Sequence, residues 1–186
     1  EVKNLHYSYP DGNQAIDDIS FVINPGESVG IIGANGAGKS TLLMLLMGII
    51  LSDSGKIIVG DVEVSKKNLS TIRRSLGMVF QNPDDQLFMT SVYDDVAFGP
   101  RNYKHSEEEV KLMAEKALEL VGISHLKDRA PFKLSGGEKR CAAIASVLSM
   151  RPNVLIMDEP SSALDPKSRR RIINLLNSFE HTKIIT

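Results

Sequence analysis

Apolar and polar residues alternate along the N-terminal third of the chain, and a period of two is typical of half-buried strands. The alternation covers Leu5–Tyr9 and Ile19–Ile23, and the segments PDGNQ and NPGE supply turns. A short apolar segment, SVGIIG (28–33), then runs into a glycine-rich turn. The apolar residues that follow predict a buried helix over Lys39–Met47.

The middle of the chain changes from strands to helices. KIIVG and DVEV predict a hairpin around Gly60, and GMVF (77–80) predicts another buried strand. From Ser91 to Ser149 the apolar spacing becomes helical. Ser106 and Glu109 fit a capping box, the S-x-x-E pattern at the start of a helix.

The last part of the chain returns to strands. Val154–Asp158 is an unbroken apolar run ending in an acid, which is typical of a central parallel strand. Asp165 and Pro166 form an N-cap and first-turn pair for a helix through about Phe179, and KIIT (183–186) begins one more strand. Strands on both sides of a helical block predict an α/β sheet with a helical insertion.

Composition narrows the class of protein. The formal net charge is −1 over 186 residues, so no basic field favours nucleic acid and we expect no nucleic-acid partner. A single cysteine, Cys141, excludes an internal disulfide framework. The longest apolar run, Leu42–Leu51, is shorter than the about 20 residues of a membrane span, so we expect a core helix. Both ends of the chain look trimmed, and no apolar leader is visible at the N-terminus.

The glycine-rich turn matches a phosphate-binding motif. GANGAGKS, Gly33 to Ser40, fits G-x-x-x-x-G-K-[ST] between a predicted strand and a predicted helix. Glycines let backbone N–H groups point at phosphate oxygens, and the helix N-terminus adds a favourable dipole. Lys39 would reach the β and γ phosphates and the Ser40 hydroxyl would ligate Mg²⁺. We therefore predict nucleotide binding.

Two adjacent carboxylates follow the predicted central strand. Asp158 would hold Mg²⁺, usually through water, and Glu159 would accept a proton from the attacking water or orient it. An acidic turn after a strand is common by itself. Together with the phosphate motif upstream, the pair favours catalysis, with Glu159 as the catalytic residue.

A second glycine pair stands where a helix should begin. Ser135 and Glu138 of LSGGE form another capping box. The box does not explain Gly136 and Gly137, because alanine favours a helix by roughly 1 kcal/mol over glycine. Bare N–H groups at a helix N-terminus admit an anion, and the γ-phosphate of ATP is the natural candidate.

LSGGE resembles the signature of the ATP-binding cassette (ABC) ATPases, and the match extends in the family's order along nearly the whole chain. The resemblance implies a P-loop NTPase core with an N-terminal antiparallel β lobe and an inserted α-helical lobe. It also implies a head-to-tail dimer in which Ser135, Gly136, Gly137 and Glu138 close over ATP held by the partner subunit. The ATP-binding residues expected on this basis are Tyr9, Gly33, Ala34, Asn35, Gly36, Ala37, Gly38, Lys39, Ser40 and Thr41.

The resemblance assigns further roles. Tyr9 looks like the aromatic residue that stacks on adenine, although a core aromatic residue is an equally good reading of the sequence. Gln81 looks like the glutamine that contacts Mg²⁺ and water, so the expected Mg²⁺ ligands are Ser40, Gln81 and Asp158. SALD looks like the loop that crosses the dimer interface, formed by Ser162, Ala163, Leu164 and Asp165.

The family also implies one domain with two sub-lobes. The ATPase core with the β lobe would be 1–82 plus 152–186, and the helical lobe with the signature would be 83–151. The family's switch histidine follows the strand that KIIT begins, so we expect a C-terminally truncated domain that binds ATP well and hydrolyses it poorly. His181 precedes that strand and is not the switch.

Features of the sequence favour a transporter subunit over other cassette ATPases. Long heptads, a second cassette and zinc-binding cysteines are absent. Gln81–Pro100 closely resembles the energy-coupling-factor and cobalt/nickel importer ATPases, whereas Ser161–Ala163 and Cys141–Ala145 depart from their usual residues. We expect a second ATPase subunit, a transmembrane subunit and a substrate-capture subunit as partners, at the cytoplasmic face of the cell membrane.

Two other classes stay open at this point. One is a catalytically idle cassette in a heterodimer, which the presence of Glu159 disfavours. The other is a P-loop kinase or GTPase, for which neither an acceptor site nor an N-K-x-D guanine motif is found. The transported substrate does not follow from this chain.

The phosphate motif generates a direct test. Lys39→Ala should abolish tight ATP binding, because the variant loses the cation that reaches the β and γ phosphates. Isothermal titration calorimetry measures the change, and wild-type affinity in the variant would refute the motif assignment.

Overall fold

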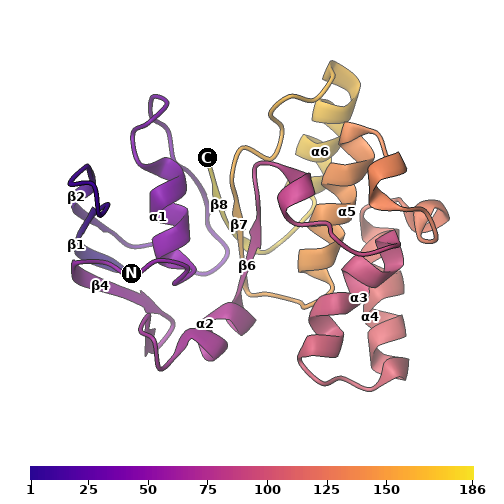
Figure 1. Ribbon diagram of the computed structural model, residues 1–186, viewed down its shortest axis with the longest axis horizontal. Helices are drawn as coiled ribbons and strands as arrows, with labels where there is room; N and C mark the ends of the chain where they lie inside the picture. Colours follow the sequence, from indigo (N-terminus) through magenta and orange to yellow (C-terminus); the bar gives the residue numbers. More distant parts are fainter. The chain divides into compact units, whose positions relative to one another are not determined.

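The computed structural model describes all residues, 1–186, and the chain divides into two compact units. The first unit comprises Glu1–Leu76, Asn153–Asp158 and His181–Thr186, and the second comprises Gly77–Pro152 and Glu159–Glu180. Each unit is therefore assembled from segments distant in sequence, and each is described separately below (Figure 1).

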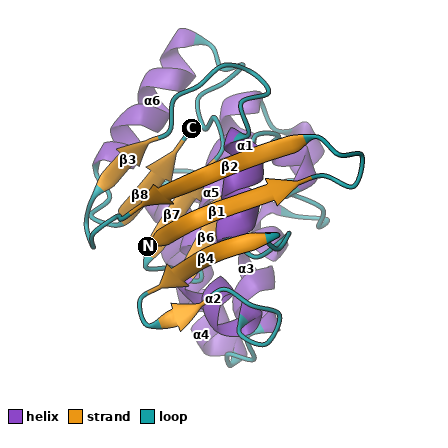
Figure 2. Cartoon of the chain, turned by 90° about the vertical axis from the view of Figure 1, so that its left-hand side faces the viewer, coloured by secondary structure: helices purple, strands orange, loops and turns teal.

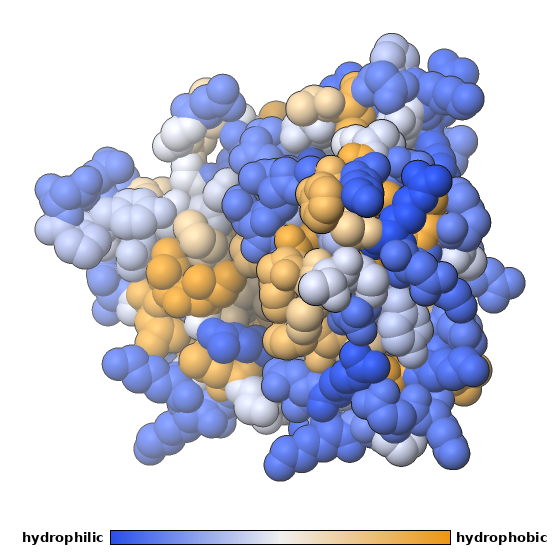
Figure 3. Space-filling model, turned by 45° about the vertical axis from the view of Figure 1, so that its right-hand side comes forward, coloured by the Kyte–Doolittle hydropathy of each residue, from blue (hydrophilic) through white to orange (hydrophobic).

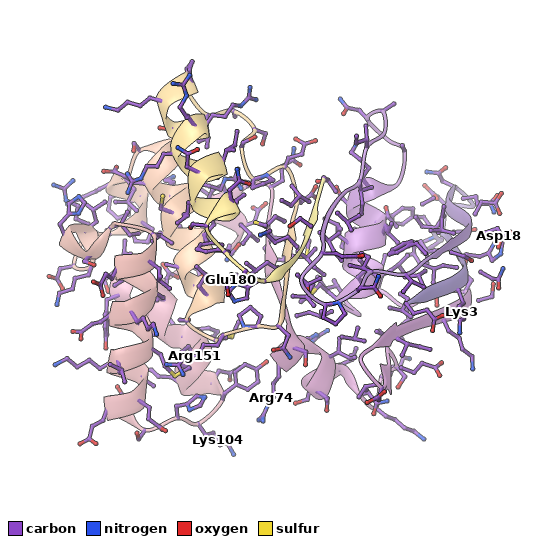
Figure 4. All side chains as sticks on the ribbon, turned by 180° about the vertical axis from the view of Figure 1, so that it is seen from behind. Lys3, Asp18, Arg74, Lys104, Arg151 and Glu180 are labelled. Atoms are coloured by element: carbon purple, nitrogen blue, oxygen red, sulfur yellow. The ribbon has the colours of Figure 1, made fainter.

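The first unit contains an antiparallel sheet with the strand order β2-β1-β4-β5. Its strands are β1 (Val2–Ser8), β2 (Gln14–Phe21), β4 (Ser54–Val59) and β5 (Val62–Glu63). Figure 2 shows this sheet toward the viewer. Leu5 and Ile16 are buried, and charged side chains such as Lys3 and Asp18 project outward (Figure 4). The predicted antiparallel β lobe is confirmed, as is the hairpin around Gly60, which joins β4 to β5.

The same unit contains parallel strands. β8 (Thr182–Ile185) lies between β3 (Ser28–Gly30) and β7 (Val154–Met157), and Ile185 is the register partner of both Gly30 and Met157. The segments that follow β3 and β7 therefore leave the sheet at the same, carboxyl edge. Helix α1 (Lys39–Leu46) follows β3 and buries its apolar face. Helix α2 (Leu69–Ser75) was not predicted, because it is short and only Ile72 in it is buried.

The second unit is mainly helical. It holds α3 (Val92–Asn102), α4 (Glu107–Leu120), α5 (Gly136–Leu148) and α6 (Pro166–Asn177), with three short 3-10 turns at Pro83–Asp85, Ser124–Leu126 and Pro131–Lys133. Helices α3, α4 and α5 pack against one another in pairs (Figure 1). Strand β6 (Leu76–Val79) begins at the end of the first unit and continues into this one. The confirmed α/β fold thus includes the helical insertion.

Helix α5 is the most buried helix of the second unit. Its residues from Arg140 to Ala145 are all buried, and most of them are small. The capping boxes predicted at the starts of α4 and α5 are both present, with the serine hydroxyl accepting from the N3 amide. Asp165 caps α6 by accepting from the amides of Lys167 and Ser168. Local capping chemistry therefore fixed these three helix starts.

The predicted sub-lobes, 1–82 with 152–186 and 83–151, stay a prediction. Residues 159–180 group with the helical unit in this structure. None of the helices combines the length and the apolar content needed to cross a bilayer. On one face of the molecule, hydrophilic side chains surround patches of apolar ones (Figure 3).

Two glycines of the β4–β5 region provide a matched stability test. Gly55 (φ 83°) lies so close to β1 that an added Cβ would sit 2.2 Å from the Asn4 carbonyl oxygen, whereas Gly60 (φ 58°) has nothing within 4 Å. Gly60→Ala should cost about 1 kcal/mol of unfolding free energy, from left-handed backbone strain alone. Gly55→Ala should cost about 3 kcal/mol or more, because the strands must also separate. Urea denaturation of both variants measures the difference, and equal losses would contradict the steric explanation.

Candidate functional site

The phosphate-binding loop lies between β3 and α1 and depends on two glycines with positive φ. Gly36 has φ 81° and Gly38 has φ 84°. A Cβ on Gly38 would lie 2.3 Å from the carbonyl oxygen of Ala15, so the backbone of β2 excludes any side chain there. Gly36 has nothing within 4 Å of its virtual Cβ, which leaves its backbone accessible to a ligand.

The start of α1 differs from the starts of α4, α5 and α6. Its N-cap is Gly38, which provides no side-chain hydrogen bond, and its first turn has no acidic residue. The first N–H groups of a helix have no intrahelical partner, so this terminus offers donors and a positive dipole end to an anion. The geometry fits the phosphate group that the motif predicts.

Lys39 already reaches across this loop. Its Nζ donates to the carbonyl oxygens of Gly33 and Ala34, at 2.9 Å each. The ammonium group is therefore held on the side of the loop where the motif requires it. Oxygen atoms of a phosphate would be equivalent acceptors for its three donors.

Tyr9 and Thr41 are brought together from distant parts of the first unit. Their hydroxyl groups lie 2.9 Å apart, and the Tyr9 ring meets the Tyr7 ring edge-on at 5.1 Å between centroids. Thr41 is buried in the first turn of α1, and Tyr9 is half-buried. The hydroxyl contact thus anchors the Tyr9 ring next to the helix that starts at the phosphate loop.

Asp158 directly follows β7, at the same sheet edge as the phosphate loop. Its side chain is buried, and its Oδ1 accepts from the Thr186 hydroxyl at 2.6 Å. Ser40 is exposed in the first turn of α1. A hydroxyl and a carboxylate are hard oxygen ligands, which is the donor set that Mg²⁺ prefers.

Glu159 and Gln81 form a direct contact within the second unit. The Gln81 amide Nε2 donates to Glu159 Oε2 at 2.8 Å, although the two residues are 78 positions apart in the chain. Glu159 also has φ 42°, a left-handed conformation that costs a residue with a side chain about 1–2 kcal/mol. Five other non-glycine residues also have positive φ, so the functional assignment of Glu159 rests on its contact with Gln81 and on its place directly after Asp158.

The predicted interface loop, Ser162 to Asp165, also contains a residue with a left-handed backbone. Ala163 has φ 55° and is exposed, while Asp165 ends the loop as the N-cap of α6. The loop conformation is thus fixed on one side by a helix cap. No contact in the structure tests its predicted role at a dimer interface.

The LSGGE segment forms the predicted helix start, and its two glycines have different surroundings. Ser135 Oγ donates to Glu138 Oε2 at 2.7 Å, and the Ser135 amide donates to the same oxygen at 2.8 Å. These bonds lower the pKa of the Glu138 carboxyl from its usual value. A Cβ on Gly137 would lie 2.7 Å from Ser168 Oγ of α6, whereas one on Gly136 would meet only Leu164, at 3.9 Å. Packing against α6 therefore gives a further reason for glycine at position 137, whereas the surroundings of Gly136 are open, and the ligand contacts of both residues stay predictions.

Sequence analysis missed three polar residues whose side chains form hydrogen bonds with the backbone between Phe80 and Met89. Asp95 is buried and accepts from the amides of Phe88 and Met89. Gln86 and Arg140 bond the backbone near Gln81. Their partners are distant in sequence or are backbone atoms, so no motif marks them. Arg140 in particular stands in a charged run that resembles an exposed helix face.

Comparisons with known proteins agree with this geometry. A family model described as ABC transporter matches residues 16–162. A Geobacter sulfurreducens protein named as an ABC transporter ATP-binding protein is 54% identical over 186 residues, which is 100% of this chain and 75% of that protein. The energy-coupling factor transporter ATP-binding protein EcfA of Methanosphaera stadtmanae is 50% identical over 178 residues, 95% of this chain and 64% of its own length.

Two solved structures superpose closely. One is cbiO1 from Clostridium perfringens, described as part of the ABC transporter complex cbiONQ, with a TM-score of 0.88 and 44% identity over 99% of this chain and 76% of that chain. The other is a dimeric, post-hydrolysis structure of the ATP-binding cassette MJ0796 bound to ADP and Pi, with a TM-score of 0.88 and 27% identity over 100% of this chain and 86% of that one.

Proposed function

The chain belongs to the ABC transporter family and is an ATPase, and from that premise we propose that it energises a membrane importer whose transmembrane part is a separate subunit. The observation that carries the importer assignment is the similarity to cbiO1 along 99% of the chain. The similarity to EcfA supports the same group of transporters, and the sequence of Gln81–Pro100 resembles that group as well.

In this proposal the first unit holds the nucleotide. The N–H groups of the loop Gly33–Gly38 and of the first turn of α1 bind the phosphates, and Lys39 exchanges its carbonyl acceptors for phosphate oxygens. Tyr9 stacks on the adenine while its hydroxyl stays on Thr41. Ser40 and Asp158 hold Mg²⁺, which when bound neutralises charge on the phosphates.

Glu159 is the proposed catalytic base. Its carboxylate accepts a proton from the water that attacks the γ-phosphate, and the Gln81 amide orients that carboxylate through the 2.8 Å hydrogen bond. Gln81 also contacts Mg²⁺ in this proposal, as its resemblance to the family's glutamine implies. Glu159 directly follows Asp158 in the chain, so the proposed base is next to the proposed Mg²⁺ ligand.

The second ATP contact comes from a partner subunit. We assign Ser135 and the open amide of Gly136 to the γ-phosphate of ATP bound by the partner, with Gly137 and Glu138 shaping the helix start. The loop Ser162–Asp165 crosses the interface in the same dimer. Loss of the γ-phosphate removes this contact, so hydrolysis reopens the dimer.

The remaining proposed partners are other subunits of the membrane transporter. A transmembrane subunit would bind the segment that follows Gln81, and a substrate-capture subunit would deliver a transition metal ion, cobalt or nickel, or a vitamin. The chain would thus be peripheral at the cytoplasmic face of the membrane. An ATPase of another importer, or of a non-transport cassette protein, is the second candidate; the membrane subunit that co-purifies with the chain distinguishes them.

The proposed base can be tested directly. Glu159→Gln should keep ATP affinity but lower turnover by roughly 10²–10⁴-fold, because an amide does not accept the proton of the attacking water. Steady-state phosphate release from the complete protein, with ATP affinity measured in parallel, checks both parts. Unchanged turnover would remove Glu159 from the mechanism.

The open glycine gives a test of the dimer contact. Gly136→Asp places a negative charge at the N-terminus of α5, where it favours the helix by up to about 1 kcal/mol but repels a phosphate. The variant should therefore keep its Tm and its ATP affinity as a single subunit, yet fail to dimerise with ATP. Light scattering measures dimer formation, and Gly136→Ala, which adds no charge, is the control. Normal ATP-driven dimerisation of Gly136→Asp would contradict the assignment.

A further inference from the structure

Arg140 is a buried cation without a carboxylate partner. It lies in α5, five residues after Ser135, and only 3% of its surface is exposed. Its Nη1 donates to the Phe80 carbonyl oxygen at 2.7 Å and its Nη2 donates to the Gln81 carbonyl oxygen at 2.6 Å. Its Nε has no hydrogen-bond partner. Burial lowers the pKa of the guanidinium group, and no ion pair includes it.

Stability does not account for such a residue. Removing a charged group from water is unfavourable, and two neutral carbonyl groups compensate for it less than a carboxylate would. Apolar residues of similar volume commonly replace a whole buried ion pair with no loss of stability, and Arg140 has no ionic partner whose charge its removal would leave unpaired. The contacts that Arg140 makes therefore suggest a functional constraint on the backbone it bonds.

That backbone carries the proposed catalytic contact. Arg140 bonds the carbonyl of Gln81, and the side chain of the same Gln81 donates to Glu159 Oε2 at 2.8 Å. A continuous path of hydrogen bonds thus runs from α5 through Arg140 and Gln81 to the proposed base, entirely within the second unit.

Other contacts fix the rest of the same segment to α5. Gln86 Oε1 accepts from the Phe80 amide at 3.1 Å, and its Nε2 donates to the Ala143 carbonyl at 2.8 Å. Lys139 forms an ion pair with Asp84 at 2.6 Å, which contributes little because the Asp84 carboxylate is exposed to solvent. Among these contacts, only those of Arg140 bond the peptide that bears the Gln81 side chain directly.

We propose that Arg140 is a positioning residue for ATP hydrolysis: it fixes the Gln81 backbone to the signature helix α5, and thereby fixes the Gln81 amide on Glu159. This inference rests on the proposed role of Glu159. It adds that two proposed ATP contacts move together: α5, the helix proposed to contact the partner's ATP, and Gln81, which bonds the subunit's own proposed base, form one rigid piece. A misplacement of about 1 Å at such a site lowers turnover by up to about 10²-fold.

The experiment compares two arginines that each bond two backbone carbonyls. Arg140→Met should lower kcat by roughly 10- to 100-fold, because the Gln81 amide loses its fixed position. ATP affinity should not change, since the phosphate loop is untouched, and the Tm should fall only modestly, because removal of a buried charge offsets the loss of two hydrogen bonds to carbonyl oxygens. Turnover, calorimetric ATP affinity and Tm are measured on the complete protein.

Arg171→Met is the matched control. Arg171 Nη2 donates to the carbonyls of Val121 and Gly122, at 3.0 Å each, near the end of α4 and away from Gln81. This variant should lower the Tm while kcat stays at the wild-type value. If Arg140→Met hydrolyses ATP like the wild type, or if the two variants lose turnover in proportion to their loss of Tm, the proposal is wrong.

A third variant decides the case in which Arg140→Met does not fold. Arg140→Lys keeps the charge but loses the planar fork that spans two carbonyls, so its kcat should be reduced at wild-type Tm; wild-type kcat in this variant would overturn the proposal. A wild-type protein that does not hydrolyse ATP would instead overturn the proposed function, and the inference with it.

Discussion

The parallel register of β3, β8 and β7 is the constraint on which the nucleotide site depends. Because Gly30 and Met157 share the same register partner, Ile185, the residues after each strand emerge at one edge of the sheet. The phosphate loop follows the first strand and Asp158 follows the other. A shift of one residue in either pairing would turn every side chain of that strand to the opposite face and move Asp158 away from the loop.

Helix starts show how the same backbone feature serves two purposes. Helices α4 and α5 begin with serine–glutamate capping boxes, and α6 begins with Asp165, so these starts satisfy their own N–H groups. Helix α1 begins with a glycine and no cap. Helix α5 combines both properties, because its cap is complete while Gly136 exposes backbone beside it. Capping secures this helix start, and the open glycine leaves the backbone beside it accessible, as the proposed ligand contact requires.

Local chemistry made much of this structure predictable from the sequence. The phosphate loop, both capping boxes, the buried strand before Asp158 and the cap at Asp165 depend on residues within a few positions of one another, and all lie where the pattern placed them. The resemblance in LSGGE led to the family, which the comparisons confirm. The roles assigned to individual site residues stay predictions.

Long-range contacts were not predictable in the same way. The Gln81–Glu159 bond joins residues 78 positions apart, and Arg140 bonds backbone carbonyls, which have no sequence signature. Sequence analysis interpreted Gly137 only as a residue that admits a ligand, and Ser168 of α6 adds a packing reason for glycine there. Only the packing of α6 reveals that reason. The spacing of apolar residues along the chain identifies a helix or a strand. It does not identify the neighbouring element against which that helix or strand packs.

The left-handed backbone of Glu159 has a consequence for engineering. Glycine would relieve the strain at that position, so a selection for thermal resistance alone would favour replacing Glu159 by a residue without a carboxylate. Descendants selected for heat tolerance would then lack the proposed catalytic base, unless the selection also required ATP hydrolysis.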